Sequence, residues 1–262
     1  MNIFKKIYNY RELLKTNVKK EIRGRYKNSI LGVMWSFLNP LLQLAVYSII
    51  FGALLAGGDS TYYIYICVAL IPWTYFTTAI TQSSFTIIGN ADIIKKVYFP
   101  REILPISVVT SGAVNFVIST IIILFFVIFS GIGLSWYLLL YPVILLVQYV
   151  LLLGIGFIVS AITVYFRDLE HIIGIILLAA FYGTPIVYKL EQLPVNLQII
   201  LQLNPMTHII NAYRDIFYYQ QMPNMKIIGL LFLVSVALLV VGYFIFKKLQ
   251  KGLQNNYNYK GE

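Results

Sequence analysis

The chain has 262 residues, of which 59% are apolar and 11% are charged. Its mean hydropathy of +0.78 excludes an ordinary soluble domain. Lys and Arg outnumber Asp and Glu by 20 to 10. Because most of these cations flank long apolar segments, anionic lipid headgroups are the expected partners rather than nucleic acid. The composition predicts an integral membrane protein without a separate soluble domain.

Long charge-free segments predict six membrane spans, since about 20 apolar residues are needed to cross about 30 Å of hydrocarbon. The segment 103–166 is long enough for two spans, and the Gly-containing sequence at 130–135 is expected to separate them. The predicted spans are about 33–57, 62–88, 104–129, 136–164, 171–188 and 226–246. The expected fold class is an all-α integral membrane protein that forms one transmembrane domain over 1–262.

Lys and Arg are distributed unequally between the loops, which sets the predicted orientation. Seventeen of the 20 basic residues lie in the N-terminal arm, the second and fourth loops and the C-terminal tail. Only Lys189, Arg214 and Lys226 fall on the other side. Both termini are therefore predicted to be cytosolic.

Residues 1–28 are predicted to form an amphipathic helix at the cytosolic interface. Apolar side chains recur at helical spacing from Ile3 to Ile22, and lysines take most of the opposite face. Such a helix lies with its apolar face among the headgroups and its basic face toward lipid phosphates. A plain positive-inside anchor is the alternative.

The cytosolic loop 89–102 mixes apolar and charged side chains. Its apolar members are Ile93, Ile94, Val97, Tyr98 and Phe99. Because a simple linker has little use for so many exposed apolar groups, the loop is predicted to dock onto another protein. The alternative is that these side chains dip into the headgroup layer.

The segment 190–220 is too polar to face lipid, although its middle carries no charge. Irregular backbone at membrane depth survives only where protein or water surrounds it. Two short helices, about 192–203 and 206–219, are therefore predicted to re-enter from the outer face as a hairpin hinged at Asn204 and Pro205. An ordinary extracellular loop is the alternative.

Missing motifs exclude several activities. No Gly-Lys pair occurs, so the chain has no P-loop for ATP. His171, His208 and Cys67 are isolated and give no metal-ligand spacing. The predicted spans are essentially free of charge, which argues against an ion-coupled carrier. The chain is therefore expected to be neither an enzyme nor its own source of energy.

Aromatic residues make up 16% of the chain, and several lie within spans or at bends. Their faces can stack on sugar rings, while ordinary apolar packing produces the same pattern. The candidate channel-lining aromatics are Trp35, Tyr47, Trp73, Phe76, Phe181, Tyr182 and Tyr188.

Five motifs follow one another along the chain. The first is Arg25-Tyr26-x-x-Ser29-x-Leu31-Gly32-x-x-Trp35-x-x-x-Asn39-Pro40. The others are 95–105, 165–169, 184–188 and 204–206. Together they resemble ABC-2 type permeases that export polysaccharides. The resemblance covers about residues 18–250 and is nearest to the O-antigen and wall teichoic acid exporters.

This resemblance implies a multi-pass homodimer in a bacterial plasma membrane. It would act with two copies of a separate subunit that binds ATP and Mg²⁺, while this chain holds no cofactor and no metal. The substrate would be a glycan linked to polyprenyl diphosphate. The ATPase-coupling residues would be Asp92, Ile93, Ile94, Lys95, Lys96, Val97, Tyr98, Phe99, Pro100, Arg101, Glu102, Arg167 and Asp168.

Two further groups of site residues are expected. Arg23, Arg25 and Lys27 would meet the diphosphate at the cytosolic entrance, because Arg offers a planar donor fork for phosphate oxygens. The outer gate would consist of Pro185, Asn204 and Pro205.

Other function classes stay open at this level. An ABC-2 permease for drugs or small lipids would share the fold. An integral membrane glycosyl- or acyltransferase would need clustered acids, histidines or a metal motif near one interface, and none clusters in the sequence. The first-span motif and the 95–105 motif favour the glycan exporter, without choosing between O-antigen and teichoic acid.

Overall fold

The computed structural model describes residues 8–24, 31–55, 59–97, 99–166 and 168–258. Throughout these ranges the regular structure is helical, as the all-α prediction requires. The long helices are α3 (Trp35–Leu55), α4 (Tyr62–Gly89), α6 (Ile103–Phe129), α7 (Tyr141–Thr163) and α11 (Met225–Asn258). The shorter α-helices are α2 (Arg11–Gly24), α5 (Ala91–Lys96), α8 (Leu169–Tyr182), α9 (Val195–Gln202) and α10 (Pro205–Phe217). Three 3-10 turns are η1 (Gly32–Met34), η2 (Trp136–Leu140) and η3 (Leu190–Gln192).

Five helical segments of the described chain are long and apolar enough to cross a membrane. They are Trp35–Leu55, Tyr62–Gly89, Ile103–Phe129, Trp136–Thr163 and Met225–Leu249. These segments correspond to five of the six predicted spans. In the predicted fifth span, 171–188, the helix α8 has only 14 residues and is about 21 Å long, short of about 30 Å of hydrocarbon. It ends before Gly183 because Pro185 cannot continue a helical hydrogen-bond ladder.

The predicted break within 103–166 is present as a turn between α6 and η2. Gly131 and Gly133 have φ angles of +84° and +83°, a left-handed conformation that glycine adopts without steric cost. Gln220 donates a hydrogen bond from Nε2 to the carbonyl oxygen of Gly133 at 2.9 Å. This bond fixes the turn against the segment that follows α10.

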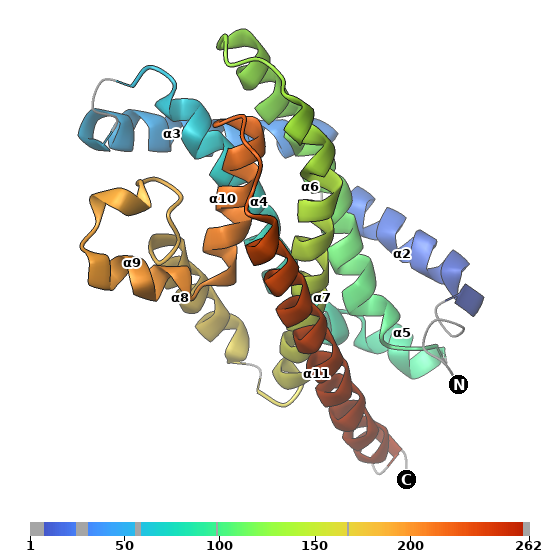
Figure 1. Ribbon diagram of the computed structural model, residues 1–262. Helices are drawn as coiled ribbons and strands as arrows, with labels where there is room; N and C mark the ends of the chain where they lie inside the picture. The colour runs from blue at the N-terminus through green and yellow to red at the C-terminus, as the bar shows by residue number, and fades with distance from the viewer. Residues whose placement is uncertain (1–7, 25–30, 56–58, 98, 167, 259–262) are drawn as a thin grey trace.

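Helices α4, α6, α7 and α11 run along one another in the centre of the molecule, and α3 runs across their direction (Figure 1). α4 is the interior helix, with Ile64, Ile66 and Val68 fully buried. α7 and α11 approach closely through glycines, because a Cβ built on Gly242 would lie 2.4 Å from the carbonyl oxygen of Gly154. The bundle is therefore held by backbone-close packing as well as by its apolar core.

The two ends of the bundle carry different elements. α5, the turn between α7 and α8 and the C-terminal part of α11 lie toward one end, whereas the turn between α6 and α7 lies at the other (Figure 1). α2 packs against α6, has no buried residue and reaches the α4–α5 junction through a 3.0 Å hydrogen bond from Lys20 Nζ to Asn90 Oδ1. Of the predicted interface helix 1–28, residues 1–7 and 25–28 lie outside the described ranges.

Candidate functional site

Arg214 of α10 is a buried cation, with 1% of its surface exposed. Its Nη1 donates to the carbonyl oxygen of Pro185 at 2.6 Å and its Nη2 to that of Ile186 at 2.8 Å. The guanidinium carbon lies 3.5 Å from the centroid of the Tyr65 ring, a cation–π distance. Among the described residues Arg214 forms no ion pair, so carbonyl dipoles and an aromatic face balance its charge.

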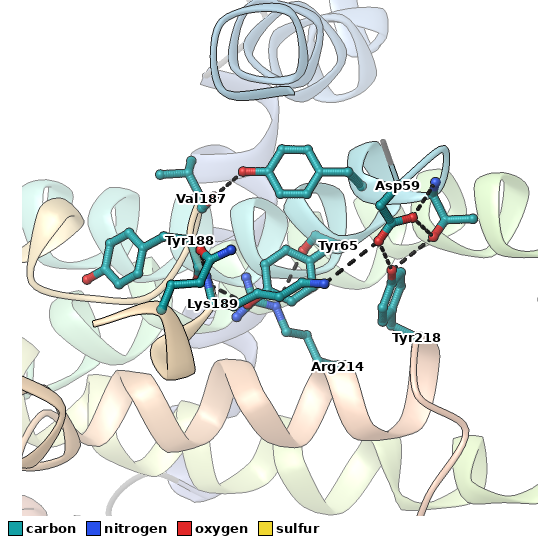
Figure 2. A network of polar contacts seen from close by, with 10 residues as sticks. Asp59, Tyr65, Val187, Tyr188, Lys189, Arg214 and Tyr218 are labelled. Atoms are coloured by element: carbon teal, nitrogen blue, oxygen red, sulfur yellow. Dashed lines mark hydrogen bonds and ion pairs between the residues drawn. The ribbon is translucent and has the colours of Figure 1, made fainter. Parts of the chain in front are cut away.

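The backbone between α8 and η3 is irregular, and side chains satisfy its carbonyl groups (Figure 2). The Tyr62 hydroxyl donates to the carbonyl oxygen of Val187, and the Tyr65 hydroxyl to that of Tyr188 at 3.0 Å. Arg214 donates to the carbonyl oxygens of the two preceding residues, Pro185 and Ile186. Four consecutive carbonyls are thus bound by three side chains from α4 and α10, which removes the cost of burying unpaired backbone oxygens.

Asn204 connects the α9–α10 junction to the same segment. Its Nδ2 donates to the carbonyl oxygen of Gly183 at 3.2 Å and to Thr184 Oγ1 at 2.8 Å. Its Oδ1 accepts a backbone N–H two residues later at 3.0 Å and caps α10. Pro205 occupies the first turn of that helix, where its missing N–H costs nothing. The predicted gate residues therefore belong to one cluster: Pro185, Asn204 and Pro205.

Asp59, in the loop before α4, lies beside this network (Figure 2). Its Oδ1 accepts from the Thr61 hydroxyl at 2.7 Å, and its Oδ2 accepts from the Tyr218 hydroxyl at 3.1 Å. Lys189 Nζ lies 3.8 Å from the same Oδ2. The hydrogen bonds from Thr61, supported by Tyr218 and Lys189, hold the pKa of Asp59 below its usual value.

Two neighbouring cavities of about 450 Å³ each flank the place where α3 crosses α4. One lies between α3, α4 and α6, and the other between α3, α4 and α8. Thr74 and Thr78 line both cavities. Five of the seven predicted channel aromatics line one or the other: Trp35, Tyr47, Trp73, Phe181 and Tyr182.

The other two predicted channel aromatics lie elsewhere. Phe76 is buried in the core, with its ring centroid 5.2 Å from that of Trp73. Tyr188 lies in the irregular segment, and its hydroxyl donates to the carbonyl oxygen of Tyr182 at 2.7 Å. Phe76 therefore contacts one lining residue, Trp73, and Tyr188 binds another, Tyr182.

The predicted ATPase-coupling loop contains the short helix α5. Ile93 and Val97 are 47% and 57% exposed, whereas Phe99 is only 8% exposed. The expectation that Phe99 is an exposed anchor is wrong, because its ring is covered within this chain, where burial removes its apolar surface from water. Asp92, Lys95 and Lys96 are exposed, Ile94 and Arg101 are half-buried, and Pro100 and Glu102 are buried. Tyr98 and Arg167 lie outside the described residues.

The remaining predicted residues within the described ranges are Asp168 and Arg23, which lie on different elements. Asp168 is exposed at the start of α8. The preceding turn is joined to α11 by the Tyr165 hydroxyl, which donates to the carbonyl oxygen of Leu249 at 2.7 Å. Arg23 is exposed in the last turn of α2, and Arg25 and Lys27 lie outside the described residues.

Two buried polar residues were not anticipated as parts of the site. Arg214 was counted as an ordinary loop charge, although it is the only Lys or Arg of α10 and lies between apolar Tyr213 and Ile216 in a segment predicted to re-enter the membrane, where a cation is a sign of an internal role. Gln148 of α7 is fully buried. It donates to the carbonyl oxygen of Pro72 at 2.9 Å and accepts from the Tyr213 hydroxyl at 3.1 Å, so it joins α4, α7 and α10.

Comparison with known proteins gives consistent matches along the chain. The family model described as ABC-2 type transporter matches residues 12–218. The "O-antigen export system permease protein RfbA" of Myxococcus xanthus is 34% identical over 94% of this chain and 96% of its own length. A protein of the same name from Klebsiella pneumoniae is 34% identical over 91% of this chain and 92% of its own length.

A more distant relative is the "Polysialic acid transport protein KpsM" of Escherichia coli, 20% identical over 89% of this chain and 92% of its own length. The family match extends from the second residue of α2 to the residue after α10 and so includes the cavities, α5 and the Arg214 network. The chain belongs to the ABC-2 type transporter family.

Proposed function

We propose that this chain is the transmembrane permease subunit of an ATP-driven exporter. It moves a polysaccharide linked to polyprenyl diphosphate, of the O-antigen or teichoic acid type, from the cytosol to the outer face of a bacterial plasma membrane. The observation that carries this proposal is the 34% identity, over nearly the whole length of both chains, to proteins named O-antigen export system permeases. The aromatic-lined cavities beside α4 support it, since sugar rings stack on aromatic faces.

Energy enters this exporter through a partner. The sequence has no Gly-Lys pair for a P-loop, so ATP and Mg²⁺ bind to a separate ATP-binding subunit. Two copies of that subunit act with a homodimer of this chain. The exposed Ile93 and Val97 on α5 support a docking role for the 89–102 loop, because an aliphatic pair surrounded by charges suits a protein interface.

The proposed topology has both termini in the cytosol and six crossings. α8 and the irregular residues 183–188 together make the fifth crossing, which α8 alone is too short to complete. The side-chain hydrogen bonds to carbonyls 185–188 support this placement, because unpaired backbone groups are not tolerated at membrane depth. α9 and α10 then re-enter from the outer face as a gate hinged at Asn204.

In the proposed mechanism, ATP-driven closure of the ATP-binding pair displaces α5. That displacement separates the helices at the dimer interface, and the glycan advances past the α3–α4 cavities toward the hairpin. Arg23, with Arg25 and Lys27, receives the diphosphate at the cytosolic entrance. Transport in this mechanism needs no covalent step on this chain.

The proposal is tested by purifying the tagged chain from its native host in mild detergent. An ATP-binding subunit is expected to copurify, and its ATP hydrolysis is expected to rise when a polyprenyl-diphosphate-linked glycan is added. Stimulation by small lipids or drugs in place of the glycan identifies the other kind of ABC-2 permease. Glycosyl or acyl transfer by the chain without any ATPase overturns the assignment as a permease.

A further inference from the structure

The accessible face of α4 is polar over the centre of the helix. Every residue from Ile64 to Trp73 is buried. Among the next nine residues, 74–82, four are buried and the other five are accessible. Their spacing of three and four residues places them on one side of the helix. All five carry a hydroxyl or an amide group: Thr74, Thr77, Thr78, Thr81 and Gln82.

This face differs from the surfaces that other long helices expose. α6 exposes Ile121, Phe125 and Ile128, and α11 exposes Leu230 and Leu233. Apolar surfaces of that kind suit lipid chains. On α4, the Thr74 hydroxyl donates to the carbonyl oxygen of Leu70 at 2.8 Å and the Thr77 hydroxyl donates to that of Trp73 at 3.2 Å, and each hydroxyl oxygen can still accept a hydrogen bond. The polar face of α4 therefore offers acceptor groups to water or to a polar substrate.

The polar face also lines three cavities in succession along α4. Thr74 and Thr78 line both cavities of about 450 Å³, and Thr77 lines the one beside α8. Thr81 and Gln82 line a third cavity, of about 430 Å³, near the α5 end of the helix. The lining residues of α4 thus extend from the α4–α5 junction to the middle of the helix, and beside Thr81 and Gln82 they include Phe85, which is 48% exposed.

Helix α3 presents matching groups from the opposite wall. Asn39 lines the cavity beside α6, and Gln43, one turn further on, lines the cavity beside α8. Both side chains are exposed. Hydroxyl and amide groups donate and accept hydrogen bonds alike, so the two walls can exchange partners with a polyol that moves between them.

The two central cavities are lined by neutral residues alone within the described chain. Among these three cavities and the residues that the structure describes, charged lining groups occur only at the third, where they are Lys20, Glu21 and Glu170. Burying a charge without an opposite charge is far more costly than burying a hydroxyl that finds a hydrogen bond. A polymer with a phosphate in every repeat would meet no compensating cation along the central walls.

We propose that the threonine face of α4 is the wall along which the exported polymer moves, and that it takes a neutral, hydroxyl-rich glycan rather than a polyphosphate. This inference rests on the proposed export function and names the substrate class within it. The threonine hydroxyls hydrogen-bond to successive sugars, while Tyr182, which is 60% exposed, offers a stacking face in the same cavity. Because each contact is weak and repeated, the polymer is held without being trapped.

The first test uses the purified complex with its ATP-binding subunit in liposomes. Two probes share one polyprenyl diphosphate carrier: a neutral hexose homopolymer and a poly(glycerol phosphate). The neutral polymer is expected to stimulate ATP hydrolysis more strongly. Thr77→Val and Thr78→Val, which remove one hydroxyl each, are expected to raise the neutral polymer concentration needed for half-stimulation about fivefold per site. Thr16→Val, at an exposed position on α2, is the matched control and leaves it unchanged.

The outcomes separate this inference from the proposed function. Equal or stronger stimulation by poly(glycerol phosphate) overturns the neutral-substrate inference while export stands. Unchanged half-stimulation in both valine variants overturns the assignment of the wall. If neither polymer stimulates hydrolysis, the export function fails and this inference fails with it.

The second test measures whether water reaches the threonine face of α4, and it does not depend on transport. In a Cys67→Ala background, Thr78→Cys and Ile121→Cys are treated with a charged thiol reagent that has access to both sides of the membrane. The cysteine at 78 is expected to react at least tenfold faster than the one at 121, because thiols react as thiolates, which need water. Equal, slow labelling of both positions shows that the α4 face meets lipid and overturns the proposal.

Discussion

The guanidinium of Arg214 stacks 3.5 Å from the Tyr65 ring centroid, and the Tyr65 hydroxyl donates to the backbone of the irregular segment that Arg214 also binds. α4 therefore holds this segment at one end and carries the threonine face further along. Because α4 is one continuous helix over Tyr62–Gly89, a displacement at its polar face is expected to reach the proposed gate.

Replacing Arg214 should release the irregular segment. Arg214→Gln loses the charge and at least one of the three carbonyl contacts, so the free energy of unfolding is expected to fall by about 3 kcal/mol. Arg214→Lys is expected to retain only part of this stability, because an ammonium group lacks the planar donor fork of a guanidinium. The measurement is thermal unfolding in detergent, with exposed Arg23→Gln as the control. Equal midpoints for Arg214→Gln and the wild type would show that the network contributes no stability.

Asp59 makes the stability of the fold depend on pH, and its lowered pKa sets the direction of that dependence. Since the folded-state pKa lies below the usual 3.8, the carboxylate stabilises the fold above that pH. This stabilisation is lost as pH falls through the folded-state value. Asp59→Asn should therefore lower the unfolding midpoint at about pH 7, and the difference from the wild type should shrink as the pH falls below 3.8. A constant difference between the two proteins across this range would contradict the assigned role of the charge.

The coupling loop offers a comparison between an exposed and a buried apolar residue. Ile93→Asp is expected to leave the permease folded and to weaken copurification of the ATP-binding subunit, at a cost of about 2 kcal/mol in binding. Phe99→Ala should instead lower the stability of the permease itself by about 3 kcal/mol, because its ring is buried. Binding is measured by pull-down from membranes and stability by thermal unfolding. The docking role of α5 is wrong if Ile93→Asp binds the subunit as well as the wild type does.

The proposed outer hairpin predicts a pattern of thiol reactivity. With Cys67 replaced by Ala, cysteines at Gln198 and His208 should react more slowly with an impermeant reagent than one at Asn224, which is exposed beyond α10. Their reactivity should rise during active export, because the helices α9 and α10 tilt apart as polymer passes. Equal reactivity of all three positions in the resting state would make this segment a solvated loop.

Local sequence patterns predicted most of the helices and one cluster of the site. Charge-free length predicted the five long apolar helices, and the Asn204-Pro205 step predicted the junction between α9 and α10. Pro185 and Asn204 were predicted as gate residues, and the structure brings both into the network around 183–188. In these cases, local signals coincide with tertiary structure.

The sequence did not reveal the features that depend on which helices are neighbours. The sequence alone suggests that Arg214 is a loop charge, whereas in the structure its guanidinium lies over the Tyr65 ring. The sequence predicts Phe99 as an exposed anchor, whereas only 8% of its surface is exposed in the folded chain. The threonines of α4 give no sequence signal of a functional face, and only the burial of the positions between them, 75, 76, 79 and 80, shows that they share one side of the helix. Burial is a tertiary property. Hydrophobic periodicity and composition therefore predict poorly which residues are buried in a helix whose apolar residues occur around its whole circumference.

The most direct test of the central claim is transport itself. The chain and its ATP-binding subunit are reconstituted in liposomes with a fluorescent neutral glycan on polyprenyl diphosphate, and the glycan that reaches the lumen is measured by its protection from an added glycosidase. The account predicts ATP-dependent protection that is absent when the ATP-binding subunit is omitted and is reduced by Ile93→Asp. Full accessibility of the glycan to the enzyme after ATP hydrolysis by an intact complex would contradict it.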